Sequence, residues 1–163
     1  TNTIMSYYSK MNLLLSMLAF FAISCTNKTD LAKEEKEIRN LLQQERKAHF
    51  DRNTSLFISE FADNMISVNK GIVKAPTKAE NEGRIGKYFS SVTFIRWDDV
   101  AEPIIRFSND GTLAYAIIQK QVIVTYPDSL GTPFYDTTDF AWASIYRKQR
   151  GEWKVEANIS TNK

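Results

Sequence analysis

The chain has 163 residues, of which 43% are hydrophobic and 25% charged, and its formal net charge is +2. These values are typical of one soluble globular domain with a short additional segment. The single cysteine excludes an internal disulfide bond. No basic run with interleaved aromatic residues is present, which argues against nucleic acid as a partner.

Residues 1–24 have the pattern of an export signal. Lys10 precedes an apolar run over residues 11–23, which is shorter than the about 20 residues needed to cross a membrane. A positive flank, an apolar core and small residues at the end are typical of a signal peptide. We therefore expect residues 1–24 to be removed during export.

The end of the apolar run, Ala22-Ile23-Ser24-Cys25, resembles the lipobox of bacterial lipoproteins. The resemblance implies that Cys25 is lipidated and becomes the mature N-terminus, and two or more acyl chains hold a protein stably at a membrane. We expect residues 25–30 to form a lipidated tether, and residues 31–163 to form a domain in the bacterial cell envelope that faces the periplasm or the surface. The alternative is an ordinary signal peptide with an incidental cysteine.

Three helices are predicted in the first half of this domain. Asp30 is a favourable N-cap for a helix from residue 31 to about residue 51, in which apolar residues recur at helical spacing. Asn53 caps a second, shorter helix. The capping-box pattern that starts at Thr77 opens a third helix, which ends near Ser90.

The remaining segments have the pattern of strands. Asn109-Asp110-Gly111 predicts a tight hairpin between two of them. Helices followed by antiparallel strands predict an α+β fold, with long N-terminal helices packed on a strongly curved antiparallel sheet. Such a cone has a natural ligand pocket at its open end. The predicted strands are residues 64–68, 72–73, 92–107, 113–126, 134–147 and 152–160.

Four stretches in this order carry a family resemblance, namely residues 47–58, 61–68, 108–115 and 146–155. Together they resemble the nuclear transport factor 2-like superfamily, in its SnoaL-like, cystatin-like α+β cone. The resemblance covers residues 31–160 and implies a homodimer formed through the outer face of the sheet. It does not specify a function, because this fold hosts isomerases, cyclases, dehydratases, binding modules and assembly domains.

Glu45 and His49 are the candidate catalytic residues. His49 is the only histidine, and it follows Glu45 by one turn on the apolar side of the first helix, so the two side chains share a face. A carboxylate that orients an imidazole could relay protons. The alternative is a hydrogen-bonded pair that seals the core. One histidine is too few for a His-rich metal site, and we predict neither a metal nor another cofactor.

The candidate ligand pocket contains aromatic and polar side chains on the predicted strands. Trp97 and Asp99 share one strand face and Asp98 takes the other, so one of the two aspartates could reach the cavity. On the last strand, alternation places Trp153, Val155, Ala157 and Ile159 on the apolar face, with Glu156 and Asn158 together on the other. Many relatives carry a histidine near the end of this strand, and this chain has none there. The predicted pocket residues are His49, Trp97, Tyr115, Trp142 and Asn158.

Three functions remain open from the sequence. The first is a lipid-anchored module that binds a small, partly apolar molecule without catalysis. The second is an enzyme of the isomerase, cyclase or dehydratase type that uses Glu45 and His49. The third is an envelope protein-interaction domain whose cone is packed shut.

Overall fold

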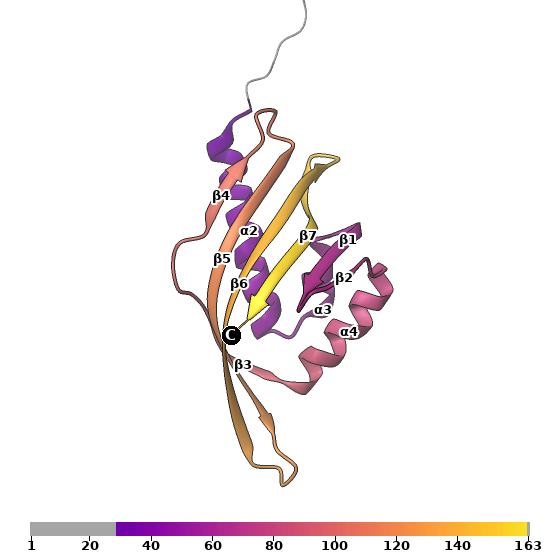
Figure 1. Ribbon diagram of the computed structural model, residues 1–163, viewed down its shortest axis with the longest axis vertical. Coiled ribbons are helices and arrows are strands. Elements are labelled where there is room, and N and C mark those ends of the chain that lie inside the picture. The colour runs from indigo at the N-terminus through magenta and orange to yellow at the C-terminus, as the bar shows by residue number, and fades with distance from the viewer. Residues whose placement is uncertain (1–28, 163) are drawn as a thin grey trace, which may run out of the picture.

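The computed structural model describes residues 29–162 (Figure 1). The predicted signal peptide, the lipidation at Cys25 and the first part of the tether lie outside the described residues, so they remain predictions. Within residues 29–162, no helix is both long and apolar enough to cross a membrane.

Three helices form where the capping residues predict them. Helix α2 spans Leu31–Phe50, α3 spans Thr54–Ser59 and α4 spans Lys78–Ser91. The side chain of Asp30 accepts a hydrogen bond from the Lys33 amide at 3.2 Å, which satisfies one of the free N–H groups at the start of α2. Asn53 caps α3 in the same way, and Thr77 and Glu80 form a complete capping box on α4.

The strands form one mixed sheet, in the order β2-β1-β7-β6-β5-β3, with β4 paired to β5. The α+β class is therefore confirmed, but the sheet is not wholly antiparallel as predicted, because β1 pairs with β7 in parallel. Parallel neighbours need a long crossover, and here the whole segment from β2 to β6, with α4 included, connects β1 to β7. The strands are β1 (Phe61–Asn69), β2 (Ile72–Lys74), β3 (Thr93–Asp99), β4 (Ile104–Phe107), β5 (Leu113–Pro127), β6 (Pro133–Gln149) and β7 (Glu152–Asn162).

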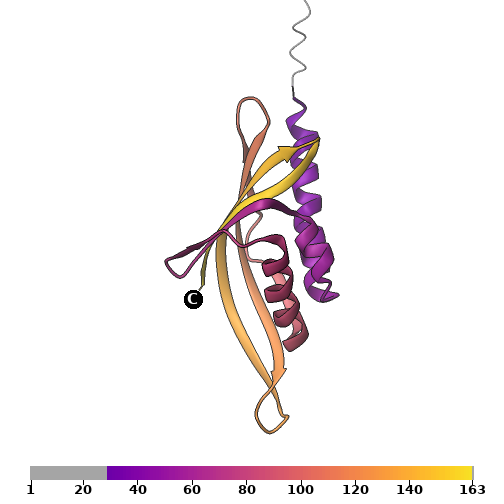
Figure 2. The ribbon, with the colours of Figure 1, turned by 90° about the vertical axis from the view of Figure 1, so that its right-hand side faces the viewer.

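The sheet curves around the helices, which all cover its concave face (Figure 2). Side chains of β5 alternate between buried and exposed over most of its length, which is the period-2 pattern of a sheet with one covered face. One continuous apolar core joins this face to the helices, with Ile38, Phe89 and Ile118 almost completely buried.

Glu34 fastens the first turn of α2 to the hairpin between β6 and β7. Its carboxylate accepts hydrogen bonds from Lys148 Nζ at 2.6 Å and from Trp153 Nε1 at 2.7 Å. Charged hydrogen bonds of this kind are stronger than neutral ones. They hold this end of the cone together, so the space for a ligand lies nearer the C-terminal half of α2.

A β-bulge in β7 changes which side chains face the interior. Tyr146 pairs with Val155 while Ile145 pairs with Ala157, so Glu156 is the extra residue. A bulge shifts the alternation by one residue. The predicted apolar face is therefore correct only as far as Val155: Ile159 is 43% exposed on the outer side, and Asn158 faces inward without Glu156 beside it.

Candidate functional site

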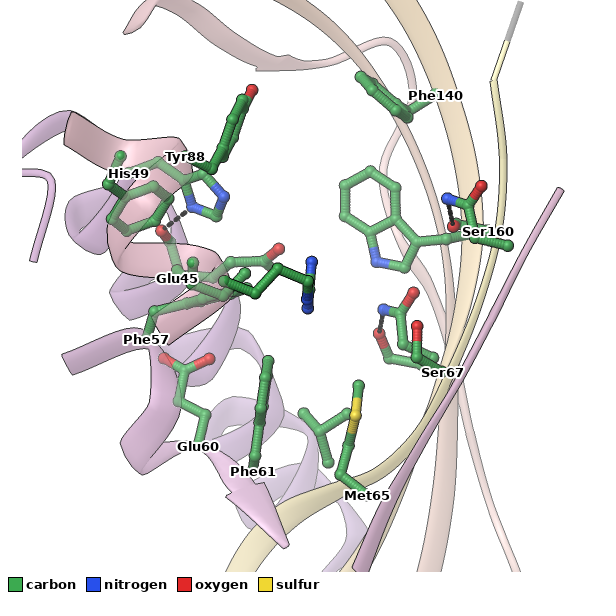
Figure 3. A pocket seen from close by; sticks show the side chains of 18 of the residues that line it. Glu45, His49, Phe57, Glu60, Phe61, Met65, Ser67, Tyr88, Phe140 and Ser160 are labelled. Atoms are coloured by element: carbon green, nitrogen blue, oxygen red, sulfur yellow. Dashed lines mark hydrogen bonds between the residues drawn. The ribbon is translucent and has the colours of Figure 1, made fainter. Parts of the chain in front are cut away.

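A cavity of about 450 Å³ lies between the concave face of the sheet and the helices. Figure 3 shows the two sides, with Glu45, His49 and Tyr88 on the helical side and Ser67, Phe140 and Ser160 on the sheet side. Ligand pockets in proteins are typically about 300–1,000 Å³. The lining residues are Glu45, His49, Phe57, Glu60, Phe61, Met65, Ser67, Asn69, Arg84, Ile85, Tyr88, Phe89, Trp97, Phe140, Trp142, Ser144, Tyr146, Val155, Asn158 and Ser160.

His49 lies in an aromatic cluster at the wall of this cavity. Its ring stacks on Trp97 with a centroid distance of 3.7 Å, and it meets Phe57, Phe89 and Phe94 edge-on at about 5 Å. Burial in this cluster lowers the pKa of His49 to about 4. The imidazole is therefore neutral at physiological pH.

The predicted side-chain pair of Glu45 and His49 does not form. His49 Nδ1 lies 2.7 Å from the backbone oxygen of Glu45, not from its carboxyl group. A carbonyl oxygen only accepts hydrogen bonds, so Nδ1 carries the proton. The Glu45 carboxyl group lines the cavity separately.

Glu45 has a strongly perturbed acidity. Burial raises its pKa to about 7, the positive charge of Lys120 opposes this rise, and the negative charge of Asp99 adds to it. A carboxyl group with a pKa near the working pH is suited to take up or release a proton. Glu45 therefore remains a candidate to take up or release a proton, although its carboxyl group is not the hydrogen-bond partner of His49 Nδ1.

Glu60 is a second acid in the cavity, and it was not among the predicted site residues. It follows α3, its exposed fraction is 4%, and burial together with the charge of Glu45 raises its pKa to about 9. It is protonated at neutral pH, so it can donate a hydrogen bond. The sequence feature that could have indicated a buried acid here is a single glutamate within the apolar stretch of residues 57–62.

Three buried side-chain atoms in the described residues have no hydrogen-bond partner, and all three belong to residues that line the cavity. They are Glu60 Oε1, Trp97 Nε1 and Trp142 Nε1. Buried polar atoms nearly always have partners. All three atoms are covered by surrounding side chains, so they lie behind the cavity surface and are not exposed to it.

The sheet side of the cavity adds a polar strip. Asn158 donates to Ser144 Oγ at 3.1 Å, and Asn69 donates to Ser160 Oγ at 2.7 Å. Ser67 lies on β1 beside them (Figure 3). The cavity therefore has both apolar and polar side chains, and both kinds occur on its helical side and on its sheet side.

The structure brings most of the predicted pocket residues together. His49, Trp97, Trp142 and Asn158 all line the cavity. Tyr115 does not: it is 43% exposed on the outer face of the sheet, because its neighbours on β5, Ala114 and Ala116, point inward. Its placement in the pocket is thus corrected.

Neither candidate aspartate on β3 lines the cavity. Asp99 forms an ion pair with Lys120, whose exposed fraction is 3%. Asp98 pairs with Arg96 at 2.9 Å and with Arg46 at 3.5 Å. Both carboxylates are committed to structural contacts. Within the described residues, no group of three or more histidine, cysteine, aspartate or glutamate side chains is arranged to hold a metal ion.

No protein-family model matches this sequence, and no curated protein is significantly similar to it. Solved structures do resemble it in fold. A ketosteroid isomerase-like protein from Erwinia carotovora atroseptica is 16% identical, with a TM-score of 0.62 over 78% of this chain and 94% of that one. A nuclear transport factor 2-like protein of unknown function from Pseudomonas putida is 18% identical, with a TM-score of 0.60 over 81% and 87%.

A third similar structure, a nuclear transport factor 2-like protein from Cytophaga hutchinsonii, is 13% identical with a TM-score of 0.62, over 78% of this chain and 96% of that one. The predicted resemblance is therefore confirmed at the level of the fold: this chain has the nuclear transport factor 2-like cone. Identities this low carry no information about the ligand or the reaction.

Proposed function

We propose that this protein is an envelope-anchored module whose cavity binds a small, partly apolar molecule. The observation that carries the proposal is a cavity of about 450 Å³ that is lined by aromatic side chains together with polar ones such as Ser67 and Asn158. A few polar groups in a largely apolar concave site fix the orientation of a ligand. A cone that is simply packed shut would not leave a space of this size between the sheet and the helices.

The binding proposal is tested with N-phenyl-1-naphthylamine, a neutral fluorophore that brightens in apolar surroundings. We expect residues 27–163 to bind it, and the substitution Ser67→Trp to weaken binding at least about tenfold, because a large side chain would fill the cavity that Ser67 lines. The melting temperature should change little, since Ser67 is only half-buried. Fluorescence titration and thermal unfolding measure the two effects.

Ser90→Trp is the matched control, because Ser90 is exposed on α4 and does not line the cavity. It should bind the fluorophore like the unmodified protein. Native mass spectrometry of gently purified protein adds the mass of any retained ligand and of the predicted homodimer. The proposal is wrong if the fluorophore does not bind and no extra mass is retained, or if Ser67→Trp binds it unchanged.

Anchoring through Cys25 is a separate part of the proposal and rests on the lipobox-like sequence alone. We expect the protein that retains residues 1–24, expressed in bacteria, to incorporate radiolabelled palmitate and to fractionate with membranes. Cys25→Ala should abolish the labelling, because the thiol is the acylated group. A Cys25→Ala protein that is still labelled would exclude this anchor.

An isomerase, cyclase or dehydratase is the second candidate function. It is favoured by two acids in one cavity with different protonation states, Glu45 with a pKa of about 7 and Glu60 with a pKa of about 9. Such a pair can supply a base and a hydrogen-bond donor at the same pH. This function would be identified by a turnover rate that rises with pH as Glu45 ionises near pH 7. The substitution Glu45→Gln should then abolish turnover.

A further inference from the structure

A second cavity of about 690 Å³ adjoins the first, and the two share Ser67, Asn69 and Arg84 as lining residues. We call the second cavity the basic vestibule. Its other lining residues come from the β1–β2 hairpin and the start of α4, namely Lys70, Ile72, Lys74, Ala75, Pro76 and Glu80. The shared residues place the two cavities next to each other at this end of the cone.

The basic vestibule carries three cations that have no acidic partner. Among the described residues, neither Lys70, Lys74 nor Arg84 lies within ion-pair distance of a carboxylate. Arg84 donates a hydrogen bond only to the side-chain oxygen of Asn81, at 3.1 Å. Three cations directed at one space without internal neutralisation favour an anion there.

The one acidic residue that lines the vestibule, Glu80, already has hydrogen-bond partners within the protein. The Glu80 carboxylate accepts hydrogen bonds from the Thr77 amide at 2.7 Å and from the Thr77 hydroxyl at 2.9 Å, and these bonds lower its pKa. It is ionised but belongs to the capping box of α4. The vestibule therefore has two more positive than negative side chains.

The hairpin turn fixes the position of one of these cations. Lys70 and Gly71 both have positive φ, 49° and 76°, as the two central residues of a tight hairpin turn. Lys70 thus lies at the turn, and Lys74 lies on the returning strand β2. The two lysines therefore lie on one short hairpin, which leads along the chain into α4 (Figure 1).

We propose that the basic vestibule binds the anionic head group of a ligand whose apolar body lies in the inner cavity. This proposal rests on the proposed binding function and adds the ligand class, an amphiphile that carries a carboxylate, sulfonate or phosphate. The charges also set its orientation. The inner cavity contains Glu45, whose negative charge disfavours an anion when it is ionised, while the vestibule adds Lys70 and Lys74 to the shared Arg84.

The test uses two probes with the same aromatic body, N-phenyl-1-naphthylamine and its sulfonated analogue 8-anilinonaphthalene-1-sulfonate. We expect the sulfonate to bind more tightly than the neutral probe at low salt, and to lose this advantage as salt screens the exposed cations. The double substitution Lys70→Gln with Lys74→Gln should weaken sulfonate binding about tenfold, from two exposed charge contacts. It should change binding of the neutral probe less than about twofold, since uncharged ligands do not respond to net charge.

The control is Lys36→Gln with Lys87→Gln, which removes the same charge from exposed positions outside both cavities. It should leave the affinity for both probes unchanged. The head-group proposal is overturned if the sulfonate and the neutral probe bind equally, or if the control weakens sulfonate binding as much as the vestibule variant does. Failure of both probes to bind the unmodified protein would instead overturn the binding function itself.

Discussion

Glu60→Gln is expected to stabilise the protein by about 5 kcal/mol at pH 8 and to have little effect at pH 4.5. Burial raises the pKa of Glu60 from its ordinary 4.5 to about 9. Between these values the folded protein holds a proton that the unfolded chain has released. The free energy of unfolding therefore falls as the pH rises from about 4.5 to about 9. Glutamine has the same shape and never ionises, so it removes this loss.

The other perturbed cavity groups decide the pH at which this effect is cleanest. Glu45 also makes the free energy of unfolding fall as the pH rises, but only up to its pKa of about 7. His49 acts with the opposite sign, because stability is lost as the pH falls from 6.5 to about 4. Above pH 7, Glu60 is the one of these three groups whose titration still changes the free energy of unfolding. Urea unfolding at pH 8 therefore measures the effect of Glu60.

Glu82→Gln provides a matched control, because Glu82 is exposed on α4 and makes no side-chain hydrogen bond or ion pair within the described residues. It should change the free energy of unfolding by less than about 0.5 kcal/mol at either pH. If Glu60→Gln proved less stable than the unmodified protein at pH 8, the carboxyl group would have to be ionised and specifically paired. That result would also remove Glu60 as a hydrogen-bond donor to a ligand.

The helices and strands were predictable because their signals are local. Asp30, Asn53 and Thr77 satisfy the free amides of the turns they precede, and the structure confirms each cap. Hairpin signals such as Asn109-Asp110-Gly111 act over a few residues and set the strand ends. An α+β cone follows from the order of these elements alone.

The positions of some pocket side chains were not predictable, because they depend on which residues of a strand face the inside of the sheet. The bulge at Glu156 reverses the alternation of β7, and it arises from pairing with β6 rather than from any local sequence signal. Tyr115 points outward because small residues, Ala114 and Ala116, occupy the inner face in the same core as Ile38. A preference for placing large residues inside gives the wrong face at such a position.

The contacts that the buried acidic residues make could not be predicted from the sequence either. Helical spacing correctly places Glu45 and His49 on one side of α2, but it does not determine which oxygen of Glu45 the ring contacts. Glu60 enters the cavity because α3 and β1 meet there, which is a tertiary feature. The sequence therefore supports a pocket, while the structure is needed to assign protonation states within it.

His49→Ala is expected to reduce the free energy of unfolding by about 3 kcal/mol, because removing a buried ring leaves a cavity in the aromatic cluster. The exposed fraction of His49 is only 4%, and its ring contacts Trp97, Phe57, Phe89 and Phe94. His49→Phe should cost less than about 1 kcal/mol at pH 7, since it keeps a ring of similar size in place. Urea unfolding of both variants measures the difference.

The pH dependence separates a packing role from a catalytic one. The unfolded chain protonates His49 near pH 6.5, while burial holds the folded pKa at about 4. His49→Phe removes this loss, so it should gain about 2 kcal/mol relative to the unmodified protein between pH 7 and pH 5. A catalytic histidine predicts the reverse pattern, in which His49→Ala folds with normal stability and loses turnover. Because Nδ1 is bound to a backbone oxygen and the ring is enclosed by aromatic side chains, we expect the packing result.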